Sequence, residues 1–336
     1  MCSTPVAGDH TSCGTNFECL SGTCQCTTTS CPNGCCTGGA CAACSPTTLA
    51  TRAVAIQSLT IASPLLYFLE GYAEGNPMVY SLSTGGGTAQ ELSIPPPGDS
   101  SLNLIFADGS YIYGASFNYN RIGRMPAIGG QFSLLTGSNS YNAKAFRANS
   151  TSLFTGYGLS SAAINVFPKA GGTPTPIVDS LTIDTSHFAV DDSFLYFLSS
   201  NGTVISRAPV AGGGATTVAA AAASETVNDL TLAGAQVVFA SSTRVGKVAA
   251  AGGTAATLDS GSAYALVTDA TTAYFFRAKS NSATCASGSE LFAIPIAGGA
   301  PRRIATEPAT SCVRSVVHDA SAVYWLTDQA IRKKAK

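Results

Sequence analysis

The sequence predicts an all-β fold: a seven-bladed β-propeller over residues 47–336, preceded by a small disulfide-rich module over residues 1–46. Three observations lead to this prediction. A glycine-ended phrase recurs along the chain, an aromatic residue recurs seven times, and ten of the twelve cysteines lie between Cys2 and Cys44. A repeat of roughly 40 residues is the length of one four-stranded blade.

The glycine phrase is a β run that ends in a pair of glycines. Its second glycines, at positions 87, 130, 172, 213, 253 and 299, lie 40 to 46 residues apart. A glycine pair between two β runs predicts a hairpin, because Gly readily adopts the positive φ of tight turns. The copies read VYSLSTGGG (79–87), GRMPAIGG (123–130), NVFPKAGG (165–172), SRAPVAGG (206–213), GKVAAAGG (246–253) and FAIPIAGG (292–299).

A second phrase places an aromatic anchor five positions after an acidic or polar residue, as in DGSYIY (108–113) and DASAVY (319–324). We expect strands a to d in each blade, with the anchor in strand b and the glycine hairpin between c and d. Asp191 and Asp192 are interpreted as turn residues that bond backbone amides, in preference to calcium ligands. The anchors are Tyr67, Tyr113, Phe154, Tyr196, Phe239, Tyr274 and Tyr324.

The seven anchors outnumber the six glycine hairpins. After the last anchor the chain has room for a third strand, over residues 330–336, and for no fourth. Residues 48–56 have the apolar character of a strand, so we predict that this N-terminal segment completes the last blade and closes the ring. The alanine-rich run over residues 219–223 is predicted to be a loop between two blades.

The recurring strand ending Pro-x-Ala-Gly-Gly resembles the repeats of bacterial secreted and lipoprotein-type β-propellers. VYWLTD (323–328) resembles the YWTD repeat of animal receptor propellers, although one copy alone has the Trp and Asp in place. The N-terminal CLSGTC, CPNGCC and GGACAAC resemble small Cys-rich modules of bacterial surface proteins. These resemblances imply a fold and no functional residue, because propellers host enzymes, lectins and scaffolds alike.

The cysteine density predicts an oxidising location, secreted or at the cell surface. Disulfides are favoured over zinc because the C-x-x-C of Cys41 and Cys44 has no matched second pair. Cys2 is either the first disulfide cysteine or a possible lipid anchor. Cys285 and Cys312 are predicted to bond each other, because they lie in a b-to-c loop and a d-to-a loop of adjacent blades, on the same face.

Several functional classes are poorly supported by the sequence. A net charge of −1 with no basic cluster beyond residues 332–336 argues against nucleic acid as a partner. No apolar run is long enough for a transmembrane helix, and no motif indicates a metal or another cofactor. His187 and His318 are interpreted as structural, and His318 should not meet Asp319, since adjacent strand residues face opposite sides.

A candidate ligand site appears when the blades are aligned on their anchors. Ten residues before each anchor lies a member of a polar ring, and if strand a is innermost this ring surrounds one mouth of the central channel. The alternative is that the ring residues are polar only because water fills the channel mouth. Tyr72, Tyr119 and Tyr157 are predicted on loops of the same face, where exposed tyrosines would grip a sugar or a peptide. The ring is Gln57, Asn103, Lys144, Ser186, Asp229, Tyr264 and Arg314.

The leading functional hypothesis is an extracellular or cell-surface binding or scaffold protein, without enzymatic activity, that presents this face to a protein or glycan. A carbohydrate-active enzyme, lyase or hydrolase, is the first alternative, and two neighbouring carboxylates at the mouth would favour it. The second alternative is a structural subunit of a surface assembly, which a large exposed apolar patch would favour.

Overall fold

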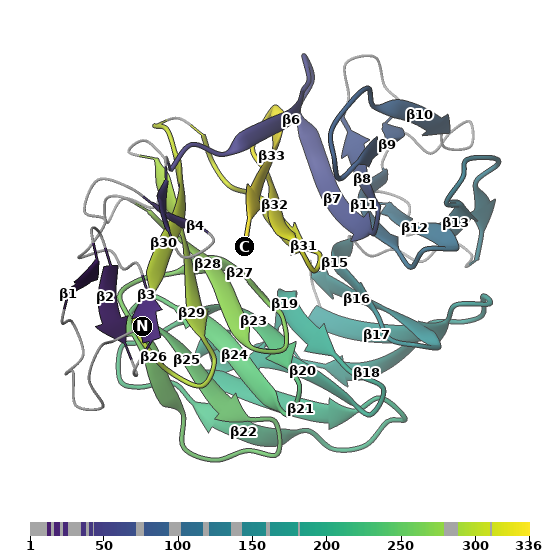
Figure 1. Ribbon diagram of the computed structural model, residues 1–336. Helices are drawn as coiled ribbons and strands as arrows, with labels where there is room; N and C mark the ends of the chain where they lie inside the picture. Colours follow the sequence, from purple (N-terminus) through teal and green to yellow (C-terminus); the bar gives the residue numbers. More distant parts are fainter. Residues whose placement is uncertain are drawn as a thin grey trace.

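The computed structural model confirms an all-β, seven-bladed β-propeller, in which seven antiparallel four-stranded sheets surround a central channel (Figure 1). Blades 1 to 6 are β7–β10, β11–β14, β15–β18, β19–β22, β23–β26 and β27–β30, and blade 7 combines β31–β33 with β6. The described residues are 12–14, 17–20, 23–25, 35–37 and 40–42, for their backbone alone, and 44–71, 77–93, 102–116, 121–135, 143–158, 162–180, 182–278, 288–309 and 311–336.

The strands take the places that the repeat predicts. Inner strands a are β7 (Ile56–Ala62), β11 (Leu102–Ala107), β15 (Ala143–Ala148), β19 (Asp184–Val190), β23 (Val227–Ala233), β27 (Tyr264–Thr268) and β31 (Ser315–His318). Strands b are β8 (Leu65–Glu70), β12 (Tyr111–Ser116), β16 (Ser152–Gly158), β20 (Phe194–Ser199), β24 (Gln236–Ser241), β28 (Thr272–Ala278) and β32 (Ala322–Leu326). A 3-10 turn, η1 (Ser200–Gly202), follows β20.

The outer half of each blade consists of strands c and d, which form a hairpin in blades 1 to 6. Strands c are β9 (Met78–Ser83), β13 (Ile122–Pro126), β17 (Ala162–Pro168), β21 (Val204–Pro209), β25 (Arg244–Ala249), β29 (Ser289–Pro295) and β33 (Ala330–Ala335). Strands d are β10 (Gln90–Ser93), β14 (Ser133–Leu134), β18 (Thr175–Asp179), β22 (Thr216–Ala220), β26 (Ala256–Ser260), β30 (Arg302–Glu307) and β6 (Thr47–Thr51). Both glycines of the hairpin after β29, Gly298 and Gly299, have the positive φ that the turn requires.

Ring closure uses the N-terminal strand β6, which pairs antiparallel with β33 as the fourth strand of blade 7. The predicted range of 48–56 was too long, because β6 ends at Thr51 and Ile56 already begins the inner strand of blade 1. Leu49 and Ala50 pack against the apolar cluster shared by blades 7 and 1. The alanine-rich run was also misplaced in part, since Ala219 and Ala220 belong to β22.

The acidic residue of the anchor phrase organises the turn between strands a and b. Oδ1 of Asp108 accepts the backbone N–H of Ser110 and of Tyr111, at 3.2 and 3.0 Å, and Oδ2 accepts the Tyr113 hydroxyl at 3.1 Å. The same pattern recurs at Asp191, Asp269 and Asp319. The turn role predicted for Asp191 is therefore confirmed.

Asp192 acts between blades instead of within its own turn. Its Oδ1 accepts hydrogen bonds from the backbone N–H and the hydroxyl of Ser150, at 3.0 and 2.7 Å, in the a-to-b turn of the preceding blade. Asp192 bonds a turn amide as predicted, but the amide belongs to the turn of the neighbouring blade. The side chain links blade 4 to blade 3.

The anchor of blade 5 was misassigned by one residue. Tyr113 lies opposite Arg124 in blade 2, and the equivalent cation of blade 5, Lys247, lies opposite Val238. Phe239 is the next residue along and its side chain occupies the other face of the sheet. Phe239 was taken as the anchor because the true anchor position of this blade holds a valine, Val238.

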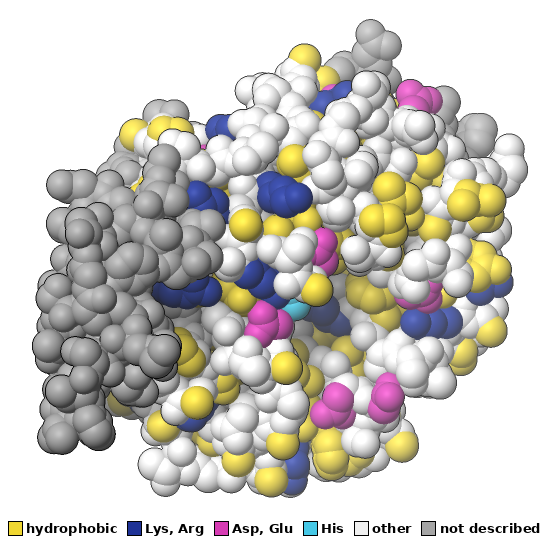
Figure 2. Space-filling model, in the orientation of Figure 1, with side chains coloured by type: hydrophobic (Ala, Val, Ile, Leu, Met, Phe, Trp, Pro, Cys, Tyr) yellow, Lys and Arg dark blue, Asp and Glu magenta, His cyan; other side chains and the backbone are white. Residues whose placement is uncertain are grey.

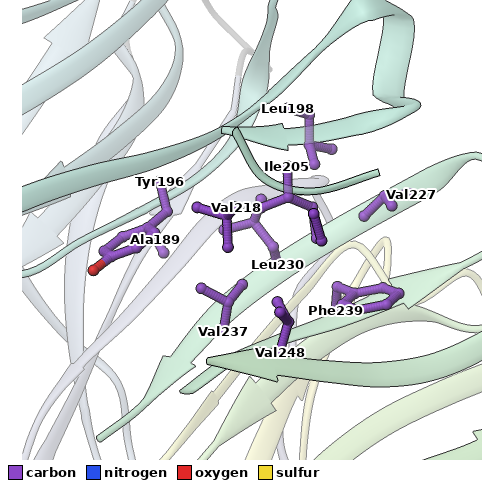
Figure 3. Close-up of a cluster of buried hydrophobic side chains, with 11 residues drawn as sticks. Ala189, Tyr196, Leu198, Ile205, Val218, Val227, Leu230, Val237, Phe239 and Val248 are labelled. Carbon is purple, nitrogen blue, oxygen red and sulfur yellow. The ribbon is translucent and has the colours of Figure 1, made fainter. Parts of the chain in front are cut away.

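The described core consists of seven apolar clusters, most of them built from facing sheets of neighbouring blades. Figure 3 shows the cluster that combines Tyr196 and Val218 of blade 4 with Leu230, Val237 and Val248 of blade 5. Each blade thus buries its two faces against its neighbours, which explains why the ring must close to be stable.

The Cys-rich segment contributes short strands: β1 (Ser12–Gly14), β2 (Phe17–Leu20) and β3 (Thr23–Gln25) form one sheet, and β4 (Cys35–Thr37) pairs with β5 (Ala40–Ala42). β4 contacts β30, and the carbonyl of Cys44 accepts the backbone N–H of Thr306 at 3.0 Å. Cys44 and Cys312, the two cysteines whose side chains are described, are both disulfide-bonded.

The bond between Cys285 and Cys312 stays a prediction, because Cys285 lies outside the described residues. We expect non-reducing peptide mapping to recover one cross-linked peptide that contains both cysteines, since the b-to-c loop of blade 6 and the d-to-a loop entering blade 7 share a face. A free thiol at either position, or a link from either one to the N-terminal cysteines, would contradict the pairing.

Candidate binding site at the channel mouth

The seven inner strands enclose a channel of about 760 Å³, to which every blade contributes side chains. Figure 2 shows Lys, Arg, Asp, Glu and His side chains around a hollow near the centre of one face. The volume lies within the range of roughly 300–1,000 Å³ that is typical of ligand pockets. Its lining combines polar residues with half-buried apolar ones such as Leu104, Phe106 and Val316.

β-Bulges explain why polar residues recur at the ring position. The pairing of strands a and b shifts by one residue around Gln57, Asn103, Lys144 and Asn228. A bulge leaves one residue of the strand outside the regular pairing and changes the direction of its side chain. The ring positions of blades 1, 2, 3 and 5 are therefore bulge residues near the start of the inner strands.

Six of the seven predicted ring residues line the channel: Gln57, Lys144, Ser186, Asp229, Tyr264 and Arg314. Asn103 is not among the lining residues, and its Nδ2 donates to the carbonyl of Ala143 in the next blade at 3.2 Å. In blade 5 the bulge residue is Asn228, which lines the channel and donates likewise to Ala263, at 3.3 Å. Asn228 was not predicted as a ring residue because Phe239 was taken as the anchor of blade 5, one residue beyond the true position.

Asp229 joins blades 5 and 6. Its Oδ1 accepts the N–H of Leu230 and its Oδ2 accepts the N–H of Leu266 in the next inner strand, both at 2.9 Å. Burial raises the pKa of Asp229, against the opposing influence of His187, Arg147 and the two amides. A charge that faces water contributes little to stability, whereas Asp229 connects two inner strands through these amides.

Lys144 and Arg147 are cations on the inner strand of blade 3, and both have exposed side chains. Within the described part of the chain, Lys144 makes no hydrogen bond or ion pair. Arg147 donates to the carbonyl of Phe146 at 2.9 Å, and its guanidinium lies 5.8 Å from the ring centre of Phe188. Arg147 was not among the predicted ligand-binding residues, although it is the one charged residue that lies opposite an anchor in strand a.

His187 also lines the channel, with Nδ1 2.8 Å from Oδ2 of Asp184. Burial lowers the pKa of His187, but the hydrogen bond to Asp184 and the negative charges of Asp229 and Asp184 outweigh this and raise the pKa overall. The expectation of a satisfied histidine is met by Asp184. The side chain is still 41% exposed, so it is accessible from the channel.

Arg314 and Tyr264, two further ring members, already have partners. Arg314 forms an ion pair with Asp328, and the two side chains are 58% and 46% exposed. The Tyr264 hydroxyl lies 2.5 Å from the Ser289 hydroxyl. These contacts leave Lys144 as the ring cation that is free of a protein partner among the described residues.

His318 lies deeper along the inner strand of blade 7 and also lines the channel. Its Nδ1 lies 3.1 Å from Nζ of Lys336, which pairs with Asp269 at 2.8 Å. The Asp319 carboxylate bonds its own turn and Tyr324, and His318 reaches only the Asp319 carbonyl. The two side chains do not meet, as predicted.

Of the three candidate tyrosines, Tyr72 and Tyr119 lie outside the described residues. Tyr157 does not lie on an exposed loop as predicted: it belongs to β16, is 3% exposed and packs in the cluster between blades 2 and 3. The strand is longer than the repeat suggested, and it carries the tyrosine into the core.

The described residues contain no group of His, Cys, Asp and Glu side chains suited to hold a metal ion. They also include no helix that is long and apolar enough to cross a membrane.

The class of protein defined by this fold and channel is the β-propeller. At the sequence level no known protein family matches the chain, and no curated protein matches it either. The solved structures compared below establish the likeness of fold alone, because they are 10–12% identical to this chain.

Three solved structures of similar fold differ in what they do. An oligogalacturonate lyase in complex with manganese has a TM-score of 0.64 at 12% identity, over 81% of this chain and 86% of its own. YCF48 bound to a D1 peptide has a TM-score of 0.62 at 10% identity, over 86% and 95%. A catalytically inactive virginiamycin B lyase from Staphylococcus aureus with quinupristin has a TM-score of 0.60 at 12% identity, over 87% and 98%.

Proposed function

We propose that the protein is a binding protein whose ligand enters the channel mouth ringed by Gln57, Lys144, Ser186 and Asn228. The observation that carries this proposal is the channel of about 760 Å³ with polar side chains placed by bulges at its mouth. An exposed lysine without a described partner is available there to a ligand. Bulges that re-aim side chains are common beside functional sites.

The contacts of Asp229 favour binding over sugar cleavage. Glycoside hydrolysis ordinarily needs two carboxylates that flank the scissile bond. Asp229 is the single carboxylate among the described residues that line the channel, and each of its oxygens accepts a backbone N–H. A purely structural subunit of an assembly should expose a large apolar patch. Among the described residues only two large apolar side chains, Ile128 and Leu134, are strongly exposed, so this alternative is less favoured.

A protein or peptide is the partner that we propose, with a glycan as the alternative. YCF48 with its bound peptide is one propeller of similar fold that acts in this way. We also propose a secreted or cell-surface location, for which the support is the cysteine content and the disulfide bonds of Cys44 and Cys312. Lipidation of Cys2 stays a prediction, since that residue lies outside the described ones.

A steric block of the mouth tests the proposal. We expect Ser186→Trp to abolish binding of ligands selected on the native protein from a peptide library and a glycan array, because the indole would fill the mouth. Thr216→Trp, on the exposed outer strand β22, is the matched control and should bind normally. Undiminished binding by a folded Ser186→Trp variant would show that the ligand site lies elsewhere.

A further inference from the structure

The charges that line the channel are predominantly positive. Lys144, Arg147 and Arg314 are the lining cations, and Asp229 is the lining anion in the described chain. Arg314 is paired with Asp328 outside the lining set, so its charge is already compensated. Lys144 and Arg147 therefore supply a positive charge that Asp229 compensates only in part.

The neighbouring inner strand adds no net positive charge beside these two cations. β15, which carries them, packs against β19, where His187 is paired with Asp184 at 2.8 Å. The lining also includes half-buried apolar residues such as Leu104, Phe106 and Val316, so the channel wall is partly apolar. Charges in a concave site with apolar walls produce a stronger local field than the same charges on an open surface. The channel should therefore concentrate small anionic groups.

A carboxylate is the anion that this arrangement suits. The guanidinium of Arg147 can bind a carboxylate through two parallel hydrogen bonds, and the ammonium of Lys144 can add a third. Asp229, on the neighbouring β23, repels any ligand anion and reduces the net positive charge. A singly charged group is thus favoured over a phosphate, which carries nearly two negative charges.

The described aromatic rings favour a peptide over an acidic sugar as the carrier of that carboxylate. Sugar rings bind best on an open aromatic face. Phe146 and Phe188 are buried. The ring of Phe106 packs edge-on against that of Phe146, with 6.4 Å between the ring centres. The ring centres of Tyr264 and Phe276 are 6.2 Å apart. The described part of the channel therefore offers cations and a partly apolar wall to a ligand, but no open aromatic face on which a sugar ring could stack.

We propose that Lys144 and Arg147 bind a carboxylate side chain of an acidic polypeptide segment that enters the channel mouth. This inference rests on the proposed binding function and specifies its ligand class. The contact is electrostatic and partly open to solvent, so affinity should fall as salt is added.

Fluorescence anisotropy on the full chain tests this proposal with three labelled probes: hexaglutamate, hexaglutamine and a galacturonate hexamer. We expect hexaglutamate to bind roughly tenfold or more tightly than hexaglutamine, and the Lys144→Gln/Arg147→Gln variant to lose that preference. Lys144→Gln alone should weaken binding several-fold and cannot act through unfolding, because Lys144 is exposed and makes no described contact. Arg302→Gln, on the outer strand β30, removes the same charge away from the channel and should bind as the native protein does.

Equal affinity for hexaglutamate and hexaglutamine, or unchanged binding in the double variant, would overturn the proposal. A preference for the galacturonate hexamer that is lost in the same variant would show that the polypeptide assignment is wrong. Neither result affects the proposed binding function, which fails only if blocking the mouth with Ser186→Trp leaves ligand binding intact.

Discussion

Trp325→Ala is expected to lower the free energy of unfolding by about 3–5 kcal/mol, as large aromatic truncations in a packed core do. Trp325 is fully buried in the cluster that joins blades 6 and 7, where it meets Phe276 edge-on at 5.5 Å. Its Nε1 donates to Oε1 of Glu307 at 2.8 Å. The substitution would therefore create a cavity and remove a hydrogen bond from a carboxylate that is itself 0% exposed.

Chemical denaturation of three proteins separates these two effects. Trp325→Phe keeps most of the apolar volume but lacks the N–H, so its loss should be the part due to the hydrogen bond, about 1–3 kcal/mol. Burial raises the pKa of Glu307, and loss of the indole donor should raise it further. If Trp325→Ala cost less than about 1 kcal/mol, the tight packing between blades 6 and 7 would be contradicted.

Removal of β6 is expected to lower the melting temperature by about 10 °C or more, because several strand hydrogen bonds and the burial of Leu49 are lost together. A chain that begins at residue 52, and so lacks β6, is compared with a control chain that begins at residue 47 and keeps it. Both lack the Cys-rich segment, so their difference reports on β6 alone. β6 pairs through residues 47–51 with Ala330 to Lys333 of β33.

Differential scanning calorimetry measures this difference, and light scattering provides a second readout. Without β6, the edge of β33 is open, and unpaired strand edges promote association between chains. The shorter chain should therefore melt earlier and also aggregate more readily. Identical melting curves for the two chains would contradict closure of the ring by the N-terminal strand.

Local sequence signals were sufficient to predict the number of blades and the way the ring closes. The turn glycines and the Asp-to-Tyr phrase act through bonds within a few residues, such as the turn amides bound by Asp108, so their spacing is visible in the chain itself. The excess of one anchor over the hairpins was enough to predict that β6 pairs with β33. Its boundary was wrong by several residues, because the end of a strand depends on its partner.

The candidate site depended more on tertiary structure. Polar residues at one blade position indicated the ring, but only the pairing of strands a and b showed that four of its positions are bulge residues and that blade 5 contributes Asn228. The burial of Tyr157 between blades 2 and 3 also followed from packing. Arg147, His187 and Asp229 lie on three different inner strands, about 40 residues apart in sequence. No local pattern could bring these charges together, because their proximity arises from closure of the ring around the channel.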